Sequence, residues 1–446
     1  MINPDFRDFI NSQAGDHLTG LLPALEQEPS VSVRFNPLKT PKAPPHPLLD
    51  GAPVPWEQMG RYVDLRPSFT LDPALHQGLY YVQEASSMIV GEIVRRIAAS
   101  ENNMPLAILD SCAAPGGKTT AVAAAMPPGS ALIANEYDFR RAEILRENVA
   151  KWGHPAVAVA RGDTARFTPL KGLFSVIVAD MPCSGEGMMR KDPEAGRQWT
   201  PALVEQCARR QRQIADNLLP ALAPGGYFIY STCTFNTTEN ERNVERIALT
   251  HGLETVPPAW PAQWNIAPSL LPKVDASRLM PHLLRGEGLF VAVLRKPGTL
   301  TPFDPPAKTK PLRSPAADMV AGLTLRREAD TIWGATAGLA ALVDITASKA
   351  GPLLAPGTEI AQMKGKDLVP AHPLALSAAL RTHTFNTVDI DTEAALSFLR
   401  RDNIALPPAT PKGHILLTHN SLPLGFVKNL GNRTNNLMPK EWRIRH

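Results

Sequence analysis

The sequence has few cysteines, no long apolar run and no strong charge of one sign, and each shortage argues against a class of protein. Its 446 residues contain four cysteines and no CxxC pair, so neither a disulfide scaffold nor a zinc site is expected. No run of about 18 apolar residues is present, which argues against a membrane span. The first residues lack a basic segment followed by an apolar core, so no secretory signal is predicted. We therefore expect a reduced, cytoplasmic protein without a metal.

Charge and composition fit a folded chain of several domains. Lys and Arg number 46 against 42 Asp and Glu, a net charge of +4, which permits a nucleic-acid partner without predicting one. Hydrophobic residues make up 44% and charged residues 20%, close to ordinary globular usage. The 44 prolines are dispersed and indicate stiff loops. A monomer is expected, although the sequence, which has no long heptad pattern to suggest a partner helix, does not determine the oligomeric state.

A regular alternation of strands and helices predicts an α/β core. The apolar runs are short and are separated by helix-compatible segments, which is typical of a mostly parallel sheet buried on both faces. They lie at 106–110, 131–134, 156–160, 174–179, 227–231 and 289–294.

The segments around this core suggest two further regions. Helices are predicted within 4–26 and 83–100, and the strict alternation at 30–35 predicts a half-buried strand. Proline-rich residues 297–315 form the clearest linker. The resulting domains are an N-terminal α+β region at 1–80, a core at 81–296, this linker, and a C-terminal α+β domain at 316–446.

The turn after the first predicted core strand is a candidate ligand site. Small residues there let a ligand approach the backbone, and the following helix begins with unpaired amides. A plain strand-to-helix turn would also explain the pattern. The residues of this turn are Cys112, Ala113, Ala114, Pro115, Gly116, Gly117 and Lys118.

Acidic residues follow the next two predicted strands. Glu136 lies 18 residues beyond Lys118, close to the spacing of a carboxylate that accepts protons from ribose hydroxyls. An exposed Glu at a helix start is the alternative. Asp163 follows the third strand and could reach an adenine amino group. Three such strand ends together favour a cofactor that contains a nucleoside.

Two cysteines follow the fourth and fifth predicted strands. Cys183 lies in the segment ADMPCSGEG with Asp180, and Cys233 lies in YSTCT. Either one could be a buried small hydrophobe, but both are expected at the same edge of one sheet. Arg190 is positioned in sequence to hold a phosphate or to lower a thiol pKa. Cys207, inside a predicted helix, is assigned to packing.

These motifs resemble a known enzyme family. CAAPGGKT at 112–119, DMPCSGEG at 180–187 and YSTCT at 230–234 occur in the order found in the Nop/Sun family of RNA cytosine-5 methyltransferases. YYVQEASSM at 80–88 and PHLLRGEGLFVAVLRK at 281–296 resemble the segments that flank the core in that family. The resemblance covers residues 30–296, and the C-terminal extension is similar to the RsmF-type branch, which modifies 16S ribosomal RNA in the small subunit.

The resemblance implies a fold, a cofactor and residue roles. The fold would be a Rossmann-like class I methyltransferase core with a small N-terminal region that resembles an RNA-binding domain. Residues 112–118 would line the pocket for S-adenosylmethionine, with Glu136 at the ribose and Asp163 near the adenine. Asp180 would lie between cofactor and target base and, if protonated, would donate to ring nitrogen 3. Cys233 would be the nucleophile, and Cys183 would assist product release.

The C-terminal region would be PUA-like, an RNA-binding fold, and RNA would be the partner. Residues 411–446 contain six Lys or Arg and one Glu, a local charge of 6 − 1 = +5. A solvated tail would explain this charge, but Phe426 and Trp442 lie among the basic residues and favour RNA contact. Two alternatives stay open: a tRNA cytosine-5 methyltransferase and a ribosome-assembly factor that binds RNA without catalysis. A DNA methyltransferase is disfavoured because it would not require Cys233.

Overall fold

The computed structural model describes residues 3–13, 18–42, 45–304 and 312–445. Its largest sheet confirms the expected α/β class. All six core strands expected from the sequence are present, and five of them pair in parallel in the order β9-β8-β5-β6-β7. These five are β5 (Ala107–Asp110), β6 (Ala131–Glu136), β7 (Val157–Arg161), β8 (Phe174–Asp180) and β9 (Leu222–Thr232).

The sixth expected strand differs from the others in direction. β13 (Leu289–Arg295) pairs antiparallel with β9, so the expectation of a mostly parallel sheet fails at this edge. The chain returns from β9 through a helix and a long excursion, which allows either direction. Three further short strands extend this antiparallel edge: β10 (Glu254–Thr255), β11 (Ala267–Pro268) and β12 (Ser277–Leu279).

Helices cover both faces of this sheet because alternate strand residues point in opposite directions. Leu109 belongs to a core packed against α8 and α9, whereas Ile108 belongs to a core packed against α4 and α5. No helix among the described residues is both long and apolar enough to cross a bilayer. The helices are α4 (Ile89–Ser100), α5 (Gly117–Ala125), α6 (Phe139–Trp152), α7 (Pro193–Gln198), α8 (Pro201–Leu218) and α9 (Glu241–His251).

The N-terminal region is a small antiparallel sheet joined to the core. The strand expected at 30–35 is present as β1, but its polar face is not exposed as the alternation predicted. Arg34 is 1% exposed, donates to Gln83 and Thr120, and lies over Trp152. The elements are α1 (Pro4–Ser12), α2 (Leu21–Leu25), β1 (Val31–Phe35), β2 (Pro53–Val54), β3 (Glu57–Val63), α3 (Pro73–His76) and β4 (Tyr80–Val82).

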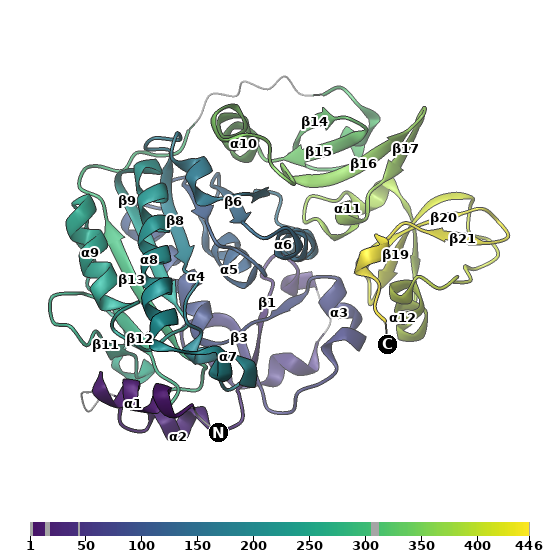
Figure 1. Ribbon diagram of the computed structural model, residues 1–446. Helices are drawn as coiled ribbons and strands as arrows, with labels where there is room; N and C mark the ends of the chain where they lie inside the picture. Colours follow the sequence, from purple (N-terminus) through teal and green to yellow (C-terminus); the bar gives the residue numbers. More distant parts are fainter. Residues whose placement is uncertain (1–2, 14–17, 43–44, 305–311, 446) are drawn as a thin grey trace.

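The C-terminal region contains two four-stranded sheets that lie beside each other on one side of the molecule (Figure 1). Part of the expected linker, 305–311, lies outside the described residues. The first sheet comprises β14 (Thr324–Glu328), β15 (Thr331–Ala335), β16 (Thr358–Lys364) and β17 (Asp367–Pro370). The second comprises β18 (Asn386–Asp389), β19 (Gly413–His419), β20 (Leu422–Asn429) and β21 (Thr434–Asn436), with α11 (His372–Leu376) and α12 (Thr392–Arg400) nearby.

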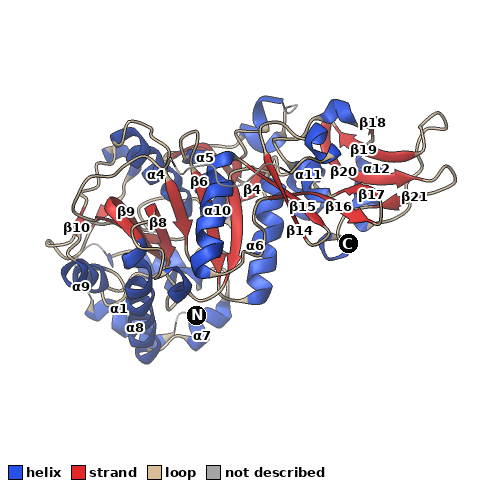
Figure 2. Cartoon of the chain, turned by 90° about the horizontal axis from the view of Figure 1, so that it is seen from above, coloured by secondary structure: helices blue, strands red, loops and turns tan. Residues whose placement is uncertain are grey.

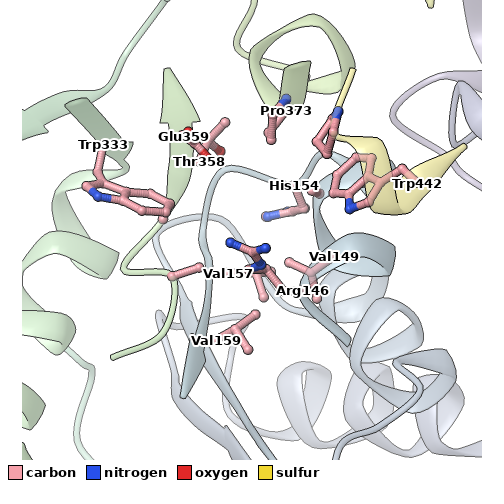
Figure 3. A pocket seen from close by; sticks show the side chains of 15 residues that line it. Arg146, Val149, His154, Val157, Val159, Trp333, Thr358, Glu359, Pro373 and Trp442 are labelled. Carbon is pink, nitrogen blue, oxygen red and sulfur yellow. The ribbon is translucent and has the colours of Figure 1, made fainter. Parts of the chain in front are cut away.

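This region is also built into the core. Helix α10 (Ala337–Ala350) lies against the central sheet (Figure 2), and its Leu339 and Val343 join the same buried cluster as α8. Val159 of edge strand β7 exchanges two backbone hydrogen bonds of 2.8 and 2.9 Å with Ala355. The junction leaves a cavity of about 60 Å³ between Arg146 and Trp333 (Figure 3), which has room for a few water molecules.

Two aromatic residues expected to contact RNA are core residues instead. Phe426 is 0% and Trp442 7% exposed, and each belongs to a hydrophobic cluster of the C-terminal region. Their interleaving with basic residues reflects a chain that turns apolar side chains inward and charged ones outward. The expectation that they bind RNA is therefore wrong.

A buried histidine makes the stability of this region depend on pH. His372 packs against Phe398 and Trp442, its Nδ1 has no hydrogen-bond partner, and burial lowers its pKa to about 3. The unfolded chain binds this proton near pH 6.5, so the stabilisation is complete above that pH and decreases as the pH falls toward 3. At pH 5 this one histidine lowers the free energy of unfolding by about 2 kcal/mol relative to its value at neutral pH.

We expect His372→Leu to reduce the loss of stability between pH 7 and pH 5 by that amount, measured by urea unfolding. His383, which is exposed, provides the control, because His383→Gln should retain the full loss. An unchanged loss in His372→Leu would contradict the assignment of this pH dependence to His372.

Candidate active site

A large pocket lies at the carboxyl ends of the parallel strands. Its volume is about 780 Å³, within the range of pockets for drug-sized ligands. Strand order reverses between β5 and β8, where open α/β sheets bind ligands. The lining residues expected from the sequence are Cys112, Glu136, Asp163, Asp180, Cys183 and Cys233.

The turn after β5 forms the back of this pocket. Gly116 has a φ of 114°, which a residue with a side chain rarely adopts, and it is the N-cap residue that precedes α5. Of the turn residues 112–118, Cys112 lines the pocket, whereas Ala113 and Ala114 are buried and Pro115 is exposed. The Ala113 amide donates to Asn135 O at 2.9 Å, so the turn is fixed against β6.

Lys118 is directed at Asp180. The Lys118 Nζ lies 2.9 Å from Asp180 Oδ2, and Ser231 Oγ donates to Asp180 Oδ1 at 2.8 Å. Burial of the ammonium acts to lower its pKa, but the Asp180 carboxylate outweighs burial and the pKa of Lys118 is raised. Both Asp180 oxygens accept in this structure, so Asp180 would need a proton from Lys118 before it could donate to the base. The ammonium is the proton-bearing group of the pair.

Polar groups suited to a nucleoside line the other end of the pocket. Glu136, 4% exposed, accepts from the amides of Ala114, Tyr137 and Asp138, which holds its carboxylate at the pocket edge. Asp163 is exposed and caps a short helical turn through Ala165 N.

The two strand-end cysteines meet at the opposite end. Cys183 Sγ lies 3.3 Å from Cys233 Sγ, and both side chains are half-buried and line the pocket. The hydrogen bond to Cys233, together with burial, raises the pKa of the Cys183 thiol well above its ordinary value. The Cys183 thiol therefore retains its proton.

One wall of the pocket was not found from the sequence. Helix α8 contributes residues at three- and four-residue spacing, including Cys207, which had been assigned to packing. The helical periodicity of polar residues in EQCARRQRQ is the signal that could have indicated a second, pocket-facing side. The lining residues from this helix are Leu203, Gln206, Cys207, Arg209, Arg210, Gln213 and Ile214.

Arg190 does not have the role expected of it. It lies 3.5 Å from Glu287 and donates to the backbone oxygens of Gln27, Glu28 and Gly286. It therefore fixes the loop after Cys183 against the N-terminal region and points away from the thiols.

A pocket of this kind, at the switch point of a Rossmann-like sheet and with paired thiols beside a Lys–Asp pair, defines a class I methyltransferase with a two-cysteine site. Three family models match the chain. The "16S rRNA methyltransferase RsmB/F" model matches residues 96–295, the "N-terminal domain of 16S rRNA methyltransferase RsmF" matches 2–85, and the "Methyltransferase RsmF PUA domain" matches 385–444.

Relatives match over most of the chain. The ribosomal RNA small subunit methyltransferase F of Serratia proteamaculans is 32% identical over 418 residues, 87% of this chain and 84% of that protein. The protein of the same name from Shewanella loihica is 29% identical and covers 99% of this chain and 95% of its own. The chain belongs to the RsmF family of S-adenosylmethionine-dependent RNA methyltransferases.

Solved structures agree on the fold. A methyltransferase homologue from Pyrococcus horikoshii has a TM-score of 0.54 and 25% identity, and the match covers 65% of this chain and 94% of that one. NSun6 from the same organism, solved with SFG, has a TM-score of 0.52 and 20% identity, and the match covers 66% of this chain and 98% of that one.

Proposed function

We propose that this protein methylates carbon 5 of a cytosine in the ribosomal RNA of the small subunit, through covalent addition of Cys233 to the base. The observation that carries this proposal is the pair of thiols 3.3 Å apart at adjacent strand ends. Simple methyl transfer to an existing lone pair needs no thiol. A carbon nucleophile inside an aromatic ring does, because it must first be activated.

The pocket has the donors and acceptors that the cofactor requires. Asn135 Oδ1 is buried without a hydrogen-bond partner and lines the pocket beside Glu136 and Asp163. An unpaired buried acceptor is costly unless a ligand completes it. S-adenosylmethionine, when bound, supplies an electrophilic methyl group. Glu136 would hold its ribose, Asp163 its adenine, and Cys112 of the turn at 112–118 would contact its remaining surface.

The protein residues divide the reaction on the base. The Cys233 thiolate forms a bond to carbon 6 and pushes an electron pair into the ring, while a proton at nitrogen 3 neutralises the charge. Lys118 would be the source of that proton: its ammonium passes the proton to the Asp180 carboxylate, which delivers it to nitrogen 3 of the base. Once carbon 5 has been methylated, its proton passes to solvent and the electron pair of that C–H bond forms the double bond to carbon 6. The bond from carbon 6 to Cys233 then breaks, and the proton on nitrogen 3 returns to Lys118 through Asp180. The electron pair of the broken bond returns to the Cys233 sulfur, which takes a proton from the Cys183 thiol.

RNA must present the cytosine unstacked, because the thiols lie inside a pocket. Arg141, Arg209 and Arg210 line its mouth and are exposed, and the side chains of Lys440, Arg443 and Arg445 are exposed at the C-terminal end. Such cations bind phosphates without reading sequence. We propose that the protein acts as a monomer in the cytoplasm, on RNA of the small ribosomal subunit.

A transfer assay with labelled S-adenosylmethionine tests this function. Purified protein should incorporate label into small-subunit ribosomal RNA, free or within the subunit, and digestion should release it as 5-methylcytidine. Label in tRNA alone would favour the tRNA alternative. No transfer to either RNA, with RNA binding retained, would favour a non-catalytic assembly factor.

A further inference from the structure

Two carboxylates lie behind the paired thiols. Glu186 and Glu239 are each 0% exposed, and among the described residues neither forms an ion pair with Lys, Arg or His. Burying a carboxylate without a cation is unfavourable unless hydrogen bonds replace its water. The mechanism above uses neither residue, so their burial at this point needs a different explanation.

The Glu239 carboxylate binds the backbone on both sides of Cys183. Its Oε2 accepts from Ser184 N at 3.1 Å and from Gln211 Nε2 at 2.8 Å. The same Gln211 amide donates to Pro182 O at 3.0 Å. The residues before and after Cys183 are thus tied, directly or through one amide, to a single buried carboxylate.

Glu239 itself lies on the loop that carries Cys233. Its Oε1 accepts from Asn236 Nδ2 at 2.9 Å, and its amide donates to Asn236 Oδ1 at 2.8 Å. The Cys233 loop therefore folds around this side chain. Further ties between the loops run from Gly187 N to Cys233 O at 2.8 Å and between Ser184 Oγ and Thr234 Oγ1 at 3.1 Å, but neither reaches the residues on both sides of Cys183 as Glu239 does.

We propose that Glu239 is a positioning residue that holds the Cys183 loop against the Cys233 loop and so places the Cys183 thiol beside the departing sulfur in the release step. This inference rests on the proposed function, because it assigns release to Cys183. Glu239 touches neither cofactor nor base; it acts through the two loops.

The hydrogen bonds around Glu239 stabilise its ionised carboxylate form. The hydrogen bonds described above to its two oxygens all come from N–H groups. A protonated carboxyl would place its own O–H against one of these N–H groups, and that hydrogen bond would be lost. Burial raises the pKa of Glu239 to about 7, and the neighbouring Glu186 acts in the same direction. Its other titratable neighbours are Cys183, Cys207 and Tyr230. The Arg212 guanidinium joins the network through Asn243, which donates to Gln211.

The test uses Glu239→Gln in the full-length protein, with covalent protein–RNA adduct read on denaturing gels. An amide at this position loses at least one of the three donors and frees the Cys183 loop. The Cys233 loop keeps its place because the bond from Glu239 N to Asn236 Oδ1 and the bonds from Phe235 N and Asn236 N to Glu186 remain. We expect turnover to fall by ~10- to 100-fold, as misplacement of an active-site group commonly does, and adduct to accumulate. A residue that only stabilised the fold would lower adduct and turnover together.

Glu241→Gln is the matched control. Glu241 is also 0% exposed and lies two residues along, but it accepts from Arg278 at 2.7 Å and from Leu270 N rather than from the Cys183 loop. This variant should accumulate no adduct. If Glu239→Gln fails to fold, Gln211→Met cuts the same tie from α8 and should trap adduct in its place.

The outcomes separate this inference from the proposed function. Adduct in both Cys183→Ala and Glu239→Gln supports the inference. Adduct in Cys183→Ala but none in Glu239→Gln that still binds S-adenosylmethionine, or none in Gln211→Met where that variant takes its place, would overturn it alone. No adduct in Cys183→Ala would overturn the proposed function, and this inference with it.

Discussion

Cys233→Ala is expected to form no covalent complex with RNA and to lose methyl transfer by at least about 10⁴-fold, the scale seen when a covalent nucleophile is removed. Cys183→Ala should still attack the base, because Cys233 remains, and should accumulate the adduct that it releases slowly. The two thiols are only 3.3 Å apart. A loss of adduct in one variant and its accumulation in the other would therefore reflect different chemical roles and not different positions in the pocket.

The measurement is a gel-shifted protein–RNA band that resists denaturation and disappears on nuclease treatment. Cys207→Ala is the control, since Cys207 lines the same pocket but has no role in the reaction; it should neither trap nor lose adduct. A shifted band that depended on Cys183 and survived in Cys233→Ala would reverse the assignment.

Lys118→Met is expected to lower kcat by ~10²- to 10⁴-fold, the usual contribution of a general acid, while affinity for S-adenosylmethionine stays within about threefold of wild type. The reason is that the ammonium lies 2.9 Å from Asp180 Oδ2 and, in the proposed mechanism, supplies the proton for nitrogen 3 through Asp180. Single-turnover kinetics would measure the first quantity and calorimetry the second.

A loss of cofactor affinity in Lys118→Met without a loss of kcat at saturation would instead assign Lys118 to the S-adenosylmethionine pocket, the role that its motif implies. Thr119, the next residue, bonds the buried Asp110 at 2.6 Å, and Thr119→Val offers a control for disturbance of the turn itself.

The sequence predicted the strands of the core and the edge at which its site residues gather. Apolar runs such as 174–179 are long enough to be recognised alone, and parallel strands bring their carboxyl ends to one edge. Cys183 and Cys233 could be placed together for that reason, although their roles came from the resemblance and await the experiments above.

The parts that could not be predicted depend on contacts between segments distant in sequence. Nothing near Lys118 shows that it would pair with Asp180, and nothing in residues 337–350 shows that α10 completes the layer beside α8. Phe426 and Trp442 were misjudged for the same reason, since local charge does not reveal which side of a strand or turn is covered. The Glu239 network joins three elements and has no local signature.

The central claim is most directly tested by mapping 5-methylcytosine in ribosomal RNA and tRNA from cells with and without this protein. The account predicts that one or more cytosines of small-subunit ribosomal RNA lose the methyl group, and that the wild-type protein but not Cys233→Ala restores it. Unchanged small-subunit ribosomal RNA, with a methyl group lost from tRNA or from no RNA, would contradict the account.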